Sequence, residues 1–232
     1  MSITIFAGDY GSGKTELALN HAVQLAAAHR GRRVVLADLD ITKPMFRSRQ
    51  MHDRLAPLGV EVLSSAPGFE YADVPSISPA IHGAIEDPCA DVVIDVGGDD
   101  TGARTLGRFF YVITAREYQM IYVINSLRPF SDDVESILAT MNAVEAASRL
   151  KITGIAANTN ASVASTVGDC ERGLSIALEV ANRRGTGTAE VKFFAVWEGL
   201  FASNAGEIRE LRDRTGVEYR IISRYMLPPW EE

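Results

Sequence analysis

The chain has 232 residues, of which 47% are hydrophobic, and this length allows one large α/β domain with a sizeable buried core. Asp and Glu (30) outnumber Lys and Arg (23), so the formal net charge of −7 argues against broad, charge-driven binding to nucleic acid or to anionic lipid. The two cysteines, Cys89 and Cys170, lie in no CxxC or Cys/His spacing, which argues against a zinc site or an iron–sulfur cluster.

Short β-branched runs alternate with longer segments of helical periodicity along the chain, a pattern typical of a parallel sheet covered by helices on both faces. We therefore expect a single α/β domain over residues 1–232, built on a mostly parallel twisted sheet of seven or eight strands. The predicted strands are 3–7, 33–37, 60–63, 92–95, 120–125, 152–157 and 191–196, with an eighth at 218–223. The predicted helices are 14–29, 44–56, 131–149, 168–184 and 204–214. The longest irregular segment is 64–78.

The first predicted strand leads directly into a glycine-rich segment that opens the first helix. This segment, Gly8-Asp9-Tyr10-Gly11-Ser12-Gly13-Lys14-Thr15, matches the phosphate-binding pattern GxxxxGK[ST] in the strand-to-helix context that the pattern requires. Glycines let successive backbone N–H groups turn toward a phosphate, and the helix N-terminus adds partial positive charge. We expect the whole segment and the following Glu16 to contact a nucleotide, with Tyr10 covering it or meeting a partner.

Two side chains of this segment carry specific chemistry. Lys14 is predicted to bridge the β- and γ-phosphates as a catalytic residue. Thr15 is predicted to offer its hydroxyl to Mg²⁺, because a hard cation prefers oxygen ligands.

A second acidic position follows the strand predicted at 92–95. Asp95 ends an apolar run and is predicted to hold the magnesium shell. Gly98, three residues further on, is placed to give its N–H to the γ-phosphate. The alternative for Asp95 is the cap of a turn.

The segment 38–49 begins where the second predicted strand ends, so it should lie beside the phosphate-binding loop at the same edge of the sheet. Asp40 is predicted to orient the attacking water as a catalytic residue, with a helix cap as the alternative. Asp38 or Thr42 is predicted to contact the magnesium shell.

Three arginines are candidates for contact with a substrate or a partner. They are Arg47 and Arg49 on the helix predicted at 44–56, and Arg104, which follows the strand that ends in Asp95. Arg47 and Arg49 cannot both face the phosphates from one helix, and an exposed helical arginine is the alternative for each.

Together these elements resemble the MinD/ParA/CobB-type P-loop NTPases, the SIMIBI class that also contains signal-recognition GTPases and dethiobiotin synthetase. The resemblance covers most of the chain and implies the three-layer P-loop NTPase fold. It also implies that Asn158, which ends the strand predicted at 152–157, reads the purine base, since a side-chain amide can pair with adenine. The segments 38–49, 95–107, 125–130 and 226–230 are similar to a bacterial subgroup of MinD/ParA-like nucleotide-binding domains, which implies no substrate.

The sequence also departs from well-known members of that class. MinD and ParA proteins carry a signature lysine directly after the first P-loop glycine, where this chain has Asp9. The ending Pro228-Pro229-Trp230-Glu231-Glu232 is unlike the basic amphipathic membrane helix of MinD. The cysteine pair of the nickel-insertion ATPases is missing. Dimer-stimulated hydrolysis, membrane patterning and metal loading of those kinds are therefore not expected.

The leading hypothesis is a slow, Mg²⁺-dependent ATPase whose nucleotide state changes its contact with a partner protein or a second subunit. Slow turnover is expected because neither a signature lysine nor an obvious catalytic arginine is apparent. The alternative is an ATP-dependent enzyme of the dethiobiotin synthetase or CobB kind, which activates the carboxylate of an acidic small molecule. A third hypothesis is a nucleotide-binding scaffold without turnover.

The remaining expectations concern ligand and location. ATP is favoured over GTP because the chain has no NKxD guanine motif. A homodimer is expected from the class, whereas nucleic acid and membrane are not expected as partners. The N-terminus lacks the features of a signal peptide, so a cytoplasmic location is expected.

Overall fold

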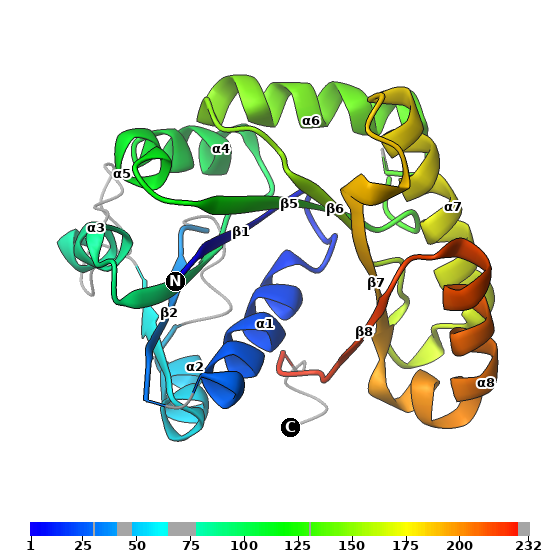
Figure 1. The fold of residues 1–232 in the computed structure, drawn as a ribbon, viewed down its shortest axis with the longest axis horizontal. Helices are drawn as coiled ribbons and strands as arrows, with labels where there is room; N and C mark the ends of the chain where they lie inside the picture. Colours follow the sequence, from blue (N-terminus) through cyan, green and yellow to red (C-terminus); the bar gives the residue numbers. More distant parts are fainter. Residues whose placement is uncertain (30, 41–47, 65–77, 130, 227–232) are drawn as a thin grey trace.

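The computed structural model describes residues 1–29, 31–40, 48–64, 78–129 and 131–226. Eight parallel strands form one twisted sheet, in the order β3-β2-β4-β1-β5-β6-β7-β8 (Figure 1). This architecture confirms the predicted α/β class, and the ends of all eight predicted strands lie within two residues of the observed ones. The strands are β1 Ile3–Ala7, β2 Arg33–Asp38, β3 Val60–Leu63, β4 Ala90–Asp95, β5 Tyr118–Ile124, β6 Gly154–Ala157, β7 Val191–Trp197 and β8 Tyr219–Ile222.

The helices agree less closely with the sequence prediction. In the described ranges they are α1 Lys14–Ala28, α2 Ser48–Leu55, α3 Pro79–Glu86, α4 Asp100–Gly107, α5 Phe110–Thr114, α6 Val134–Ser148, α7 Val167–Arg183 and α8 Glu198–Thr215, with 3₁₀ turns η1 Ala56–Leu58, η2 Ser162–Ala164 and η3 Thr188–Glu190. The short helices α3, α4 and α5 were not predicted, because one or two turns carry little periodicity. The irregular segment predicted at 64–78 lies almost wholly outside the described residues.

Helix α8 begins six residues before the predicted start at Asn204. Asn204 has non-helical dihedral angles (φ −133°, ψ 30°) and divides the helix at a kink. Its side-chain amide donates to the carbonyl of Leu200. The sequence signal at Asn204 therefore marks the kink within the helix rather than its N-terminus.

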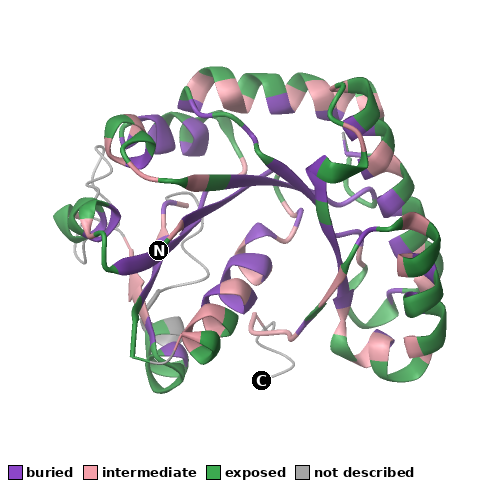
Figure 2. Ribbon diagram, viewed as in Figure 1, coloured by how far each residue is buried: buried purple, intermediate pink, exposed green. Residues whose placement is uncertain are grey.

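The two faces of the sheet carry separate apolar cores, which makes three layers. Successive strand residues point to opposite faces, so Ile3 and Ile5 join one core while Phe6 joins the other. The core of α3 to α8 is the larger, and α1 and α2 cover the other face. Figure 2 shows the central strands buried between helices whose outer surfaces are exposed, whereas the edge strands β3 and β8 are only partly buried. None of the helices in the described ranges is long and apolar enough to span a membrane.

Strand β1 lies between β4 and β5. The glycine-rich segment 8–15, called the P-loop from here on, directly follows β1 and therefore lies at the carboxyl edge of the sheet. Phe6 of β1 is aligned with Asp95 of β4, which is in turn aligned with Asp38 of β2. The ends of three neighbouring strands thus bring residues that are far apart in the sequence to one edge.

Helix α4 packs tightly against the loop that follows β4, and Gly102 makes this packing possible. A Cβ at Gly102 would lie 2.4 Å from the carbonyl oxygen of Gly97 and 2.7 Å from its Cα. We expect Gly102→Ala to lower the free energy of unfolding by about 1–3 kcal/mol, because backbone must shift to admit the methyl group. Urea unfolding measures this change. Gly83→Ala in α3 is the matched control, since its Cβ meets nothing within 4 Å, and an equal effect in both variants would contradict the interpretation.

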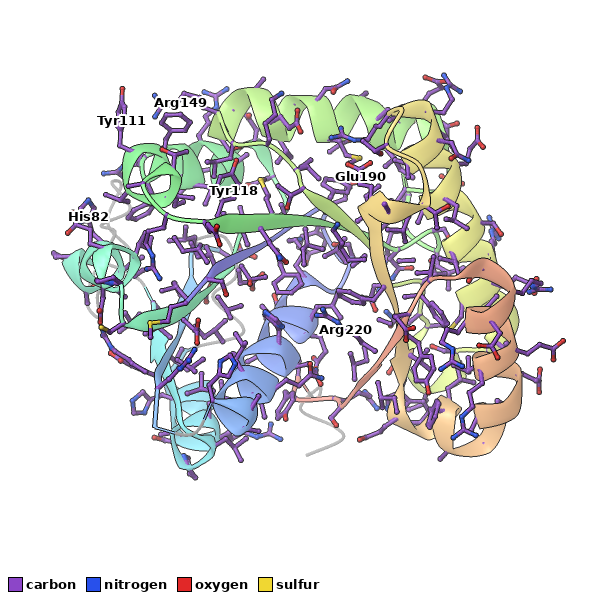
Figure 3. The ribbon with its side chains drawn as sticks, in the orientation of Figure 1. His82, Tyr111, Tyr118, Arg149, Glu190 and Arg220 are labelled. Carbon is purple, nitrogen blue, oxygen red and sulfur yellow. The ribbon has the colours of Figure 1, made fainter. Side chains whose placement is uncertain are left out.

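A second prediction concerns His21, whose ring packs edge-on against Phe6 in the α1 face. Burial, and then the positive charge of Arg220, lower the pKa of His21 to about 4. Arg220 itself lies on β8 with its guanidinium 4.0 Å from the centre of the Phe193 ring (Figure 3). The folded state therefore favours neutral His21.

Because the folded pKa is depressed, this contribution is fully present above the unfolded pKa of 6.5 and is lost as the pH falls toward 4. We expect the wild type to lose about 2 kcal/mol more stability than His21→Gln between pH 7 and pH 5. Urea unfolding at the two pH values measures the difference. His82→Gln, at an exposed site on α3 (Figure 3), should keep the wild-type pH dependence, and a His21→Gln variant that also keeps it would refute the assignment.

Candidate nucleotide-binding site

The loop between β1 and α1 curls back on itself, and its glycines are required for this shape. Gly11 and Gly13 have φ angles of 75° and 88°, in the left-handed region. A Cβ at Gly13 would also lie 2.2 Å from the side-chain nitrogen of Asn158. The hydroxyl of Ser12 is fully buried in this loop and has no hydrogen-bond partner among the described residues. A buried, unsatisfied hydroxyl in a glycine loop at a helix N-terminus fits the binding of a phosphate group.

Lys14 is 2% exposed, and its ammonium donates to the carbonyl oxygen of Asp9 at 2.9 Å. The side chain therefore runs back across the loop from the start of α1. This position holds a positive charge against the cradle of backbone N–H groups, which is where the phosphates of a nucleotide would lie.

Thr15 and Asp95 meet across the site, because the Thr15 hydroxyl donates to the Asp95 carboxylate at 2.6 Å. Asp38, aligned with Asp95, accepts a hydrogen bond from the backbone N–H of Asp40 at 2.9 Å. Mg²⁺ usually takes one or two protein oxygens and completes its shell with water and phosphate. The hydroxyl of Thr15 and the carboxylate of Asp95 could supply those protein oxygens. No group of three or more His, Cys, Asp or Glu residues suited to a metal occurs in the described ranges.

The loop after β4 contacts both the P-loop and the end of β2. A Cβ at Gly98 would lie 2.7 Å from the backbone nitrogen of Tyr10, so only glycine allows this approach. The position of a Cβ at Gly97 is 3.3 Å from the carboxylate of Asp40. The structure thus gathers Asp38, Asp40, Asp95 and Gly98 around the P-loop.

Asp9, in the place of the signature lysine, points into the protein. Its carboxylate accepts hydrogen bonds from Tyr122 on β5 at 3.2 Å and from the hydroxyl of Ser131 at 3.0 Å. Both donors are at most 2% exposed. Burial, and then the neighbouring Asp9 carboxylate, raise the pKa of the Tyr122 hydroxyl, which keeps it a proton donor. Asp9 therefore fastens the P-loop to β5 and to the segment before α6.

Asn158 and Glu16, which the sequence predicts to contact a nucleotide, also make contacts within the protein. The amide nitrogen of Asn158 donates to the carbonyl of Ser12 at 2.7 Å and so supports the P-loop, while its buried oxygen has no partner among the described residues. Glu16 accepts from the backbone N–H groups of Tyr225 and Met226 and anchors the C-terminal segment on α1. Burial raises the pKa of Glu16, although these backbone bonds oppose the shift.

The other candidates lie apart from this cluster or outside the described residues. Arg104 is 73% exposed and forms an ion pair with Asp100 of its own helix at 2.6 Å. Thr42 and Arg47 lie outside the described residues, as does the side chain of Arg49. Tyr10 is 74% exposed at the loop surface.

Sequence reasoning assigned no chemistry to Tyr122, Arg128 or Ser131. The guanidinium Nε of Arg128 donates to the carbonyl of Gly11 at 3.1 Å. The usable sequence signal was that residues 125–129 directly follow a predicted strand, because the carboxyl ends of parallel strands gather at the edge where the P-loop lies.

Comparison with known proteins agrees with this geometry. The model of the CobQ/CobB/MinD/ParA nucleotide binding domain family (CbiA) matches residues 3–172. No curated protein sequence is a significant match to this chain.

Among solved structures, the fold is similar to that of FtsY proteins. FtsY from Mycoplasma mycoides has a TM-score of 0.56 at 16% identity, over 84% of this chain and 60% of that one. Chloroplast FtsY from Physcomitrella patens has a TM-score of 0.57 at 16% identity, over 86% and 59%. The signal recognition particle receptor FtsY from Elizabethkingia anophelis has 0.51 at 18%, over 84% and 57%. The chain spans less than two thirds of each of these structures, and the likeness shows the fold alone.

The contact between Asp9 and Ser131 gives a prediction for stability. We expect Asp9→Ala to lower the free energy of unfolding by about 1–3 kcal/mol, because two buried hydroxyls lose their acceptor. Ser131→Ala should cost less, and the double variant should show a coupling of about 0.5–1.5 kcal/mol. Urea unfolding of the four proteins of this cycle measures the coupling. Additive effects would mean that Asp9 does not fasten the loop through Ser131.

Proposed function

Because the chain belongs to the CobQ/CobB/MinD/ParA nucleotide-binding domain family, we propose that it binds ATP with Mg²⁺, hydrolyses it slowly and acts as a nucleotide-dependent switch on a partner protein. The observation that carries this proposal is the contact of three loops around one phosphate cradle. The P-loop touches the end of β4 through Thr15 and Asp95, and it touches the next loop at Gly98. Asp40, two residues after β2, has its carboxylate beside Gly97 in that loop.

Each of these groups has a role in phosphate chemistry. Lys14 would neutralise charge on the β- and γ-phosphates, and the P-loop N–H groups would fix their position. Thr15 and Asp95 would hold Mg²⁺, which supplies charge stabilisation on the transferred phosphoryl oxygens. Asp40 would accept a hydrogen bond from the attacking water and orient it.

The same contacts support a switch. A γ-phosphate in the cradle would bear on the loop at Gly97 and Gly98, because the backbone of Gly98 packs on that of Tyr10, and through Gly97 on the carboxylate of Asp40. Its loss on hydrolysis would release that contact. The surface formed by these loops is therefore the part of the protein whose shape would depend on the nucleotide, and a partner protein or a second copy of the chain would read it there.

The nucleotide we propose is ATP rather than GTP, because the NKxD motif is missing. The carboxylate-activating alternative depends on a pocket for an acidic substrate lined by Lys43, Arg47, Arg49 and Arg104. Arg104 pairs with Asp100 on its own helix, which gives that alternative no support.

The proposal is tested by thermal unfolding and phosphate release with ATP, GTP or ADP in the presence of Mg²⁺. We expect saturating ATP to raise the melting temperature of the wild type by about 5–10 °C. Lys14→Ala should lose this shift, because a buried charge on the phosphates is removed. Asp40→Ala should keep the shift but lose slow phosphate release.

Arg172→Ala, at an exposed position on α7, is the control and should behave as the wild type. If no nucleotide raises the melting temperature of the wild type, the nucleotide-binding proposal is wrong. Stabilisation by ATP without any phosphate release would remove the hydrolysis step and leave binding alone.

A further inference from the structure

Residues 125–129, which follow β5, place Arg128 beside the P-loop, and turn hydrogen bonds fix its backbone position. The backbone N–H of Arg128 donates to the carbonyl of Asn125 at 3.0 Å, and its carbonyl accepts from the N–H of Ser131 at 3.1 Å. The side chain of Asn125 also accepts from the N–H of Leu127 at 3.1 Å. These turn bonds fix where the arginine side chain begins.

The same segment is tied to the structure on both sides of Arg128. Before it, the N–H of Ser126 donates to the hydroxyl of Thr159, in the segment that follows β6, at 3.1 Å. After it, the hydroxyl of Ser131 donates to the carboxylate of Asp9 in the P-loop at 3.0 Å. Ser126, Thr159 and Ser131 are each 2% exposed. The residues on both sides of Arg128 are therefore hydrogen-bonded to the rest of the protein, and Ser131 is bonded to the P-loop itself.

The guanidinium lies along the edge of the P-loop. Its Nε donates to the carbonyl of Gly11 at 3.1 Å, and its Cδ and Cζ lie 3.5 and 3.6 Å from the position of a Cβ at Gly11. Gly11 has a left-handed φ of 75°, a conformation that favours glycine. A bond through Nε leaves the two terminal nitrogens of the guanidinium for other acceptors.

Those terminal nitrogens make no hydrogen bond or ion pair with any residue in the described ranges. Arg33 and Arg214, by contrast, are paired with carboxylates, as expected in a chain with excess acidic residues. The one carboxylate of the P-loop, on Asp9, is directed to Tyr122 and Ser131 instead. The arginine beside the phosphate cradle is thus positioned without a carboxylate to neutralise it.

We propose that Arg128 contacts the terminal phosphates of the bound nucleoside triphosphate from within the same chain. A guanidinium presents a planar fork of donors that matches phosphate oxygens, and it stabilises the charge that develops on them during phosphoryl transfer. Arg128 then supplies, from the same subunit, the charge-stabilising arginine that some nucleotide switches receive from a partner protein. This inference rests on the proposed function and adds a residue to its site.

The test compares the affinities of ATPγS and ADP by calorimetry, with Mg²⁺ present, in the wild type and three variants. Arg128→Ala should weaken ATPγS binding about tenfold and change ADP binding much less, because only the triphosphate carries the terminal group. Arg128→Lys keeps the charge without the fork and should fall between the two. Arg172→Ala should keep the wild-type ratio, and phosphate release from ATP should fall about tenfold or more in Arg128→Ala.

The outcomes separate this inference from the proposed function. If the wild type binds neither nucleotide, both fail. If the wild type binds both and Arg128→Ala keeps the wild-type ratio of affinities, only the role of Arg128 is overturned. Thermal unfolding without nucleotide shows whether Arg128→Ala is folded, and Arg128→Lys carries the test if it is not.

Discussion

The 2.6 Å hydrogen bond between Thr15 and Asp95 is the contact on which the geometry of the site depends. It joins the start of α1 to the end of β4, and it forms only because β1 and β4 are parallel neighbours in register. The same parallel arrangement places the end of β2 next to the end of β4. A parallel sheet therefore concentrates hydroxyl and carboxylate groups at one edge, where they can share a cation and a phosphate.

The P-loop is held from several sides before any ligand arrives. Asn158 supports the carbonyl of Ser12 from the end of β6, and Asp9 is fastened by buried donors from β5 and from the segment before α6. Gly98 packs directly on the loop backbone. Such support would lower the conformational entropy that the loop loses on binding a ligand.

The acidic residue at position 9, where MinD and ParA proteins have a lysine, has a structural role. Its carboxylate is used inside the fold, while a positive charge reaches the loop from Arg128 on another element. Arg128 is 113 positions or more from any P-loop residue (128 − 15 = 113), and only the pairing of β5 with β1 brings the two segments together.

The sequence by itself determined the sheet, the P-loop and the strand that ends in Asp95, because these depend on local patterns. Alternating apolar runs mark strands, and the glycine spacing with Lys14 and Thr15 is a local requirement of one loop. The tertiary structure alone decided which polar groups meet. It brings the amide nitrogen of Asn158 to the carbonyl of Ser12 and the carboxylate of Glu16 to the C-terminal segment, contacts that the sequence did not indicate. The physical reason is that a hydrogen bond needs two groups within about 3 Å of each other, and strand order, which no local pattern encodes, sets that distance.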